Sequence, residues 1–152
     1  FSIIGYAANR KGQPVLMADL GTVVHEFNHS FIKIEGDTKN ALAKSGKTIK
    51  SYSAFCMKQQ AYDSWQTILE ESLVRAAEKC YFIEHGDGKV DKGIRNEMNH
   101  GFFWMPELVQ TLRYYESHRK KYPTFTSFYP EIIRFFDRYV TNMEKEMKKA
   151  MK

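Results

Sequence analysis

Residues 25–29 read His-Glu-Phe-Asn-His, and this stretch decides how the rest of the chain is interpreted. If the segment is helical, His25 and His29 lie one above the other, because positions i and i+4 share one face of a helix. Two imidazoles placed in this way can bind one metal ion, and Glu26 beside them can work on a water at that ion. The stretch therefore predicts a zinc site with hydrolytic chemistry.

The residues around this motif predict a helix from Leu20 to about Ile34, with Asp19 or Thr22 as its N-cap and Gly36 at its end. At about 100° per residue, the two histidines lie on a different side of this helix from its apolar stripe. A histidine of the core would lie within the stripe, so we expect this pair to face solvent or a cleft. The stripe consists of Leu20, Val24, Phe27, Phe31 and Ile34.

The composition indicates one folded domain, residues 1–152. Hydrophobic residues make up 43% of the 152 residues and aromatic residues 14%, which is enough for a real core. No apolar run approaches the roughly 20 residues of a membrane span. The net charge is +5, and much of the excess lies in the lysines of the last turns, which we interpret as a solvated helix end. We therefore expect no membrane span and no nucleic-acid partner.

The remaining pattern predicts a mainly α fold of the α+β class. A short N-terminal β-hairpin or small sheet precedes the helix with the two histidines, and three to four further helices follow it. Because the chain opens with Phe1 rather than Met, we expect it to be the C-terminal part of a longer precursor. The expected elements are strands at Phe1–Ala7 and Pro14–Ala18, a loop at Glu35–Ser51 with a short helical turn around Ala41, and a helical region at Ser53–Tyr81 that breaks near Asp63. A loop at His85–Gly101 and helices at Pro106–Lys120 and from Ser127 to the end complete the chain.

The two cysteines, Cys56 and Cys80, have neither CxxC nor zinc-ribbon spacing. Buried thiols are the favoured interpretation, and a disulfide is the alternative.

A catalytic zinc ion usually has three protein ligands, so the motif needs a third ligand from elsewhere. The segment 68–76 stands out, because it is expected to be a helix that carries adjacent carboxylates. The candidates are Glu70, Glu71, Glu78, His85, His100 and His118, with Asp63 and Asp87 as weaker ones.

The motif at 25–29 followed by Leu69-Glu70-Glu71-Ser72 resembles the gluzincins, which are zincin metallopeptidases with two helical histidines and a glutamate from a later helix. Their aminopeptidase branch has Leu-Asn-Glu-Gly at the second motif, so Glu71 falls on the zinc-binding glutamate and Glu70 on the asparagine. A closer resemblance is to a bacterial family of uncharacterised, zincin-like exported proteins. It rests on His-Glu-Phe-x-His-Ser-Phe, Glu-Ser-Leu-Val-Arg-Ala and Tyr-Pro-Thr-Phe, and it spans roughly Val15 to Phe136.

The resemblance implies a zincin-like fold and a zinc metallopeptidase, with Zn²⁺ bound by His25, His29 and Glu71. Glu26 would act as general base on a zinc-activated water and pass the proton to the leaving amine. The expected partner is a peptide or protein substrate that binds along an edge strand before residue 20. The expected location is extracytoplasmic: periplasmic, surface-anchored or secreted.

The sequence leaves alternatives for two supporting roles, the donor to the oxyanion and the partner of Glu71. An oxyanion donor is expected among Tyr114, Tyr115, Tyr122 and His118, and Tyr122 is preferred. Arg75 lies four residues after Glu71, so it either holds that glutamate or forms an ordinary surface ion pair. The alternative function is a non-catalytic, degenerate zincin-like interaction domain in which the two histidines of the motif are vestigial.

Overall fold

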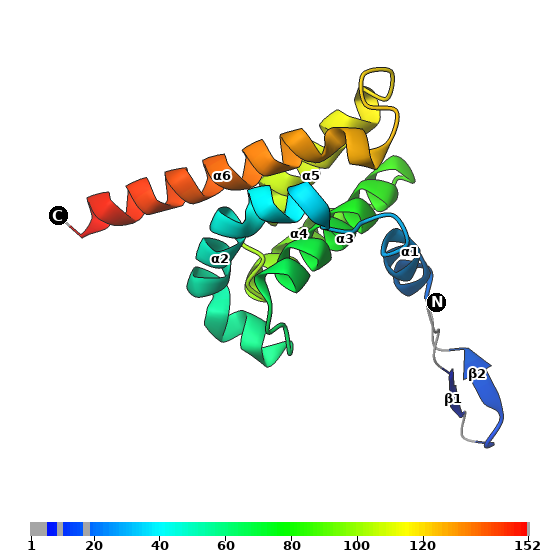
Figure 1. The fold of residues 1–152 in the computed structure, drawn as a ribbon. Helices are drawn as coiled ribbons and strands as arrows, with labels where there is room; N and C mark the ends of the chain where they lie inside the picture. The colour runs from blue at the N-terminus through cyan, green and yellow to red at the C-terminus, as the bar shows by residue number, and fades with distance from the viewer. Residues whose placement is uncertain (1–5, 9–10, 17–18, 152) are drawn as a thin grey trace.

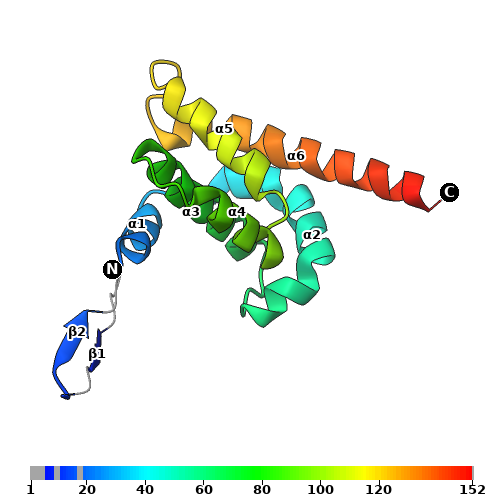
Figure 2. The same ribbon diagram turned by 180° about the vertical axis from the view of Figure 1, so that it is seen from behind.

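The computed structural model describes residues 6–8, 11–16 and 19–151, and it is mainly helical (Figure 1). Helix α3 lies at the centre and contacts α1, α2, α4 and α5, while α6 packs along α2 and α5 (Figure 2). The elements in chain order are β1 (Tyr6–Ala8), β2 (Pro14–Leu16), α1 (Leu20–Asn28), α2 (Gly36–Gln59), α3 (Trp65–Glu84), α4 (Val90–Asn99), α5 (Met105–Ser117) and α6 (Phe125–Ala150).

The two short strands pair antiparallel, with Tyr6 opposite Leu16 and Ala8 opposite Pro14. Within the described part of the chain they contact each other and no helix. Parts of the two predicted strands, residues 1–5 and 17–18, lie outside the described residues.

The core lies between α3 and the helices around it. Ile68, Leu69 and Leu73 of α3 are fully buried, as are Leu108 of α5 and Phe136 of α6. The predicted break near Asp63 falls between α2 and α3, and the side chain of Ser64 caps α3 by accepting a hydrogen bond from Thr67 N at 3.0 Å. The helices expected at 106–120 and from residue 127 correspond to α5 and α6.

Helix α1 is shorter than predicted. Asp19 caps its start as expected, but the helix ends at Asn28 instead of about Ile34. The reason is tertiary: the backbone of the following segment is bound by side chains of other helices instead of by the next helical turn. Lys33 N donates to the Tyr129 hydroxyl at 3.1 Å, and Ile34 N donates to Glu70 Oε1 at 2.8 Å. Gly36 therefore begins α2 instead of ending α1.

The apolar stripe predicted for α1 does not enter the core. Leu20, Phe27 and Phe31 are 56%, 64% and 61% exposed. They line one wall of a groove of about 860 Å³ whose other walls include Tyr81 of α3 and Tyr115 of α5. The part of the predicted stripe that is buried, Ile34, lies in the segment after the helix.

The loop predicted for 35–51 is wrong, because the structure forms helix α2 there. This helix looks polar in the sequence because small residues occupy much of its buried face. The hydroxyls of Ser45 and Ser53 donate back to carbonyls of the same helix, at 3.3 and 2.8 Å, and so are satisfied without a partner from another element. The buried residues of this face are Leu42, Ser45, Gly46, Ile49, Ser53 and Met57.

Gly46 is needed for the contact between α2 and α3. A Cβ at this position would lie 2.4 Å from Cε3 of Trp65 and 3.2 Å from Cδ1 of Leu69. We expect Gly46→Ala to lower the free energy of unfolding by about 1–2 kcal/mol, because the overpacking outweighs the gain in helix propensity. The matched control is Gly93→Ala in α4, where a Cβ meets only the Lys79 side chain at 3.5 Å or more. Urea unfolding should show the control to be as stable as the parent or more so, and equal effects of the two changes would contradict this packing.

The loop predicted for 85–101 is wrong in its second half, where residues 90–99 form helix α4. Its apolar stripe is short and only partly covered: Val90 is buried, while Ile94 and Met98 pack against the core and are partly buried. The turn at the start of that segment is as expected, with Gly86 in the left-handed region at φ 71°.

Both cysteines are free in the structure. Cys80 is buried, its thiol donates to the Val109 carbonyl at 3.6 Å, and burial raises its pKa to about 12. Cys56 is only partly buried.

The C-terminal half of α6 extends beyond the other helices (Figure 1), and its lysines are exposed, with Lys149 paired to Glu146 at 2.6 Å. Among the described residues, no helix has both the length and the apolar character that a bilayer crossing requires.

Candidate metal centre

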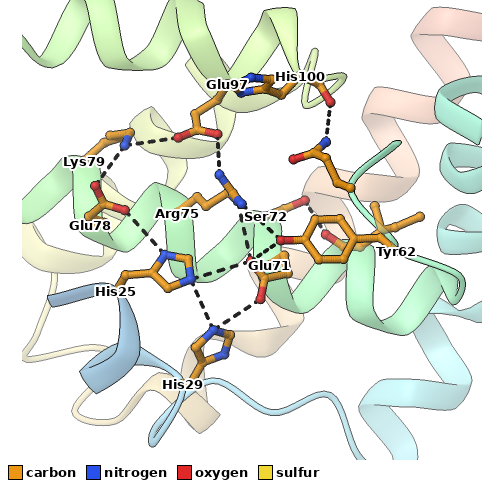
Figure 3. Close-up of polar contacts among 12 residues, drawn as sticks. His25, His29, Tyr62, Glu71, Ser72, Arg75, Glu78, Lys79, Glu97 and His100 are labelled. Carbon is orange, nitrogen blue, oxygen red and sulfur yellow. Dashed lines mark hydrogen bonds and ion pairs between the residues drawn. The ribbon is translucent and has the colours of Figure 1, made fainter. Parts of the chain in front are cut away.

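Helix α1 carries the two histidines on the face turned toward α3. His25 lies in its last turn, and His29 is the C-cap residue, whose backbone is still helical at φ −58° and ψ −22°. The two side chains therefore remain one turn apart, and their Nε2 atoms approach to 3.3 Å (Figure 3). The apolar side chains of the same helix point to the groove on its other side, so the histidines face α3 as a separate polar surface.

Glu71 of α3 completes a group of three ligand-type side chains. Its Oε2 lies 3.6 Å from His25 Nε2, and its Oε1 lies 3.2 Å from His29 Nε2 (Figure 3). Within the described part of the chain, His25, His29 and Glu71 form a group that could hold a metal ion, with ligand atoms within 4.8 Å of one another. All three side chains are partly buried, between 12% and 34% exposed.

The spacing of these atoms suits a tetrahedral zinc ion. Ligand atoms at about 2.0–2.2 Å from a tetrahedral centre are about 3.3–3.6 Å from one another. The Nε2 atoms of His25 and His29 are 3.3 Å apart, and each faces a different oxygen of Glu71: Oε2 is 3.6 Å from His25 and Oε1 is 3.2 Å from His29. Two imidazoles and one carboxylate are also a ligand set that zinc accepts when one position is left for water. The residues present therefore fit a zinc ion that keeps one position for water.

Two further side chains hold Glu71. Tyr62, in the connection between α2 and α3, donates its hydroxyl hydrogen to Glu71 Oε2 at 3.0 Å, and Arg75 Nη2 donates to the Tyr62 oxygen at 3.0 Å. Burial raises the pKa of Tyr62 more than Arg75 lowers it, so the phenol keeps the proton that it donates. Arg75 also forms a partly buried ion pair with Glu71, in which Nε lies 3.5 Å from Oε2 without a hydrogen bond, so it is not an ordinary surface pair.

Glu78 holds the second nitrogen of His25, with Oε2 at 3.5 Å from Nδ1. Burial raises the pKa of Glu78, but the hydrogen bond with His25 and the charge of Lys79 outweigh it, so the pKa lies below its usual value. A carboxylate at Nδ1 keeps the proton on that nitrogen and leaves Nε2 free to bind a metal ion. Glu78 is thus a partner of the first histidine instead of a third ligand.

Glu97 of α4 connects Arg75, which lies beside Glu71, with Lys79, which lies beside Glu78. Its carboxylate binds Arg75 Nη1 at 2.8 Å and Lys79 Nζ at 3.2 Å, while Lys79 also binds Glu78 at 3.0 Å (Figure 3). Both Glu97 and Lys79 are buried. The charges of the three carboxylates Glu71, Glu78 and Glu97 and of the two cations sum to −1, which favours a bound cation.

The structure brings together three of the five predicted site residues. His25, His29 and Glu71 converge, whereas Glu26, on the same helix, is not a member of the converging group. Tyr122 is not brought to the group either: its hydroxyl binds Glu131 and its ring packs against Phe128. The tyrosine that contacts Glu71 is Tyr62, which the sequence did not single out.

The other candidate ligands have different partners. Glu70 binds the backbone of Ile34, as described above, and His85 and His118 contact backbone carbonyls one helical turn earlier. The backbone carbonyl of His100 accepts from Gln60 Nε2 at 2.6 Å. Asp87 binds the backbone of Lys89, and the Asp63 carbonyl accepts from Lys50.

Residues 16–135 match the model of a family described as a domain of unknown function (DUF4932), and the chain therefore belongs to this family. The match includes α1 with both histidines, and it includes Tyr62, Glu71, Glu78 and Glu97. Comparisons with curated proteins and with solved structures found no match.

Proposed function

We propose that this chain is a zinc-dependent hydrolase with a zincin-like metal centre, and that it is a metallopeptidase of the gluzincin type. One observation carries the proposal: the Nε2 atoms of His25 and His29 lie 3.3 Å apart, and the carboxylate of Glu71 of α3 faces both of them, with Oε2 3.6 Å from His25 and Oε1 3.2 Å from His29, a spacing that suits zinc. These residues come from helices separated by the whole of α2, so their convergence is a property of the fold and not of the local sequence.

The chain supplies defined groups for this chemistry. A zinc ion held there would act as a Lewis acid, lowering the pKa of water toward about 7 and polarising a carbonyl. Glu26 follows the first histidine by one residue, about 100° further round the helix, so it does not point at the ion as His25 does. Its carboxylate is the group that we expect to accept a proton from water and to deliver it to the leaving amine.

The support around the ligands favours a preorganised site. Glu78 lies beside Nδ1 of His25, and the Glu71 carboxylate accepts a hydrogen bond from Tyr62 and pairs with Arg75, so that the ligands have little freedom to turn away. The extracytoplasmic location and the peptide substrate stay predictions that rest on the resemblance of the motifs.

Hydrolysis tests this proposal directly. The purified chain is incubated with a mixture of fluorescence-quenched peptides, before and after removal of metal with dipicolinate and after addition of one equivalent of Zn²⁺. We expect cleavage that is lost with the chelator and restored by zinc. Bound zinc with no cleavage of any peptide would instead favour the degenerate, non-catalytic alternative, and cleavage that survives the chelator would contradict a zinc enzyme.

A further inference from the structure

The connection between α2 and α3 brings Tyr62 against Glu71, and it does so through a left-handed backbone conformation at the residue before the tyrosine. Helix α2 ends in a Schellman motif, in which Tyr62 N donates to Met57 O at 3.0 Å and Ala61 N donates to Lys58 O at 3.1 Å. The left-handed residue of this motif is usually glycine, but here it is Ala61, at φ 59°. Among the described residues it is the one non-glycine residue with positive φ.

This conformation directs the next residue across to α3. Tyr62 lies immediately after Ala61, packs edge-on against Phe102 at 6.3 Å, and reaches Glu71 with its hydroxyl. A backbone conformation that is unfavourable for a residue with a Cβ persists where the surrounding contacts determine it, and such positions are concentrated at functional sites. The contact with Glu71 gives this one a function.

Tyr62 and Arg75 do not contribute equally to holding Glu71. Arg75 Nε lies 3.5 Å from Glu71 Oε2, yet it is a buried nitrogen without a hydrogen-bond partner. The other end of the guanidinium is bound by Glu97 and by the tyrosine oxygen. The hydrogen bond to Oε2 therefore comes from Tyr62, and it leaves Oε1 as the oxygen nearest to His29, at 3.2 Å.

We infer that Tyr62 is a positioning residue for the metal ligand Glu71. Its hydroxyl, held by Arg75, binds one carboxylate oxygen and so presents the other to the ion beside His29. Without this hydrogen bond, the carboxylate is free to rotate toward Arg75 and loses its alignment with the two histidines. The inference rests on the metal centre of the proposed function but not on the reaction that it performs.

The test compares Tyr62→Phe with the parent chain and with a control, Tyr52→Phe, whose tyrosine is 46% exposed on α2. Affinity for Zn²⁺ is measured by competition with a chromophoric chelator, and the geometry of the site by the visible absorption of bound Co²⁺. We expect Tyr62→Phe to bind zinc about 10–100-fold more weakly, with altered Co²⁺ bands, because a group that orients a ligand contributes on that scale. The control should bind as the parent does.

The outcomes distinguish the positioning role of Tyr62 from the existence of the metal centre itself. If the parent binds zinc and Tyr62→Phe binds it with the same affinity and the same Co²⁺ spectrum, Tyr62 does not position Glu71, although the metal centre stands. If the variant does not fold in the absence of metal, as judged by near-ultraviolet circular dichroism, the hydroxyl is structural and the inference is wrong. If the parent binds no zinc, the inference falls together with the proposed function.

Discussion

Glu26→Gln is expected to lower kcat/KM for peptide hydrolysis by about 10²–10⁴-fold, the range for loss of a general base. Glutamine keeps the size of the side chain but cannot accept and return a proton. Because Glu26 is not one of the three converging residues, the variant should retain one zinc ion per chain with nearly the parent affinity. Both quantities are measured on the same preparation, kcat/KM with a fluorogenic peptide and zinc by elemental analysis.

The comparison with Glu107→Gln makes this result specific. Glu107 is exposed in the first turn of α5, so its replacement should leave both activity and zinc content unchanged. Full activity of Glu26→Gln would remove the proposed general base. Loss of zinc along with activity would show that Glu26 acts as a ligand or as a support of the ligands instead.

The second large effect is expected for Glu71→Gln. This change removes the negative charge that faces both histidines at 3.2–3.6 Å, and an amide oxygen is a much poorer zinc ligand than a carboxylate. We expect zinc affinity to fall by at least about 100-fold, more than for the loss of a group that only orients a ligand, and activity to fall with it. Dialysis against a zinc buffer followed by elemental analysis measures the affinity.

Glu70→Gln is the matched control, because it makes the same change at the neighbouring position. Its amide oxygen can still accept the hydrogen bond from Ile34 N, so the segment after α1 keeps its anchor. Zinc affinity should stay within about 3-fold of the parent. If Glu70→Gln loses zinc and Glu71→Gln keeps it, the assignment of the third ligand is wrong.

The sequence could predict that His25 and His29 lie together, because their relation depends on local helix geometry. A helix places His25 and His29 one turn apart wherever it packs, and the residues after Leu69 identified Glu71 by resemblance. The end of α1 was not predictable in this way. It is decided by Tyr129 of α6 and Glu70 of α3, which bind the backbone of residues 33 and 34.

Helix α2 was missed for a different physical reason. Hydrophobic periodicity detects buried faces that consist of large apolar residues, whereas part of this face is Ser45, Gly46 and Ser53. The helix is buried around Gly46 because Trp65 packs closely against its backbone, and not because the helix has large apolar side chains there.

Whether a neighbour of Glu71 could be predicted depends on how far it lies from Glu71 in the sequence. Arg75 and Glu78 follow it at i+4 and i+7, so helical spacing alone places them on its face. The sequence offered Glu78 as a candidate third ligand and not as the partner of His25. Tyr62 and Glu97 come from a turn and from another helix, and no local pattern connects them to the site. Tyr122, the preferred oxyanion donor, is a similar case. Nothing in the sequence around it indicates that its ring packs on Phe128.

Anomalous diffraction at the zinc edge, from crystals of the chain grown with Zn²⁺, tests the metal centre most directly. We expect one strong peak at about 2.0–2.2 Å from Nε2 of His25, Nε2 of His29 and one oxygen of Glu71. A map without a peak between these side chains, or a zinc ion bound by other residues while the two imidazoles point elsewhere, would contradict this expectation.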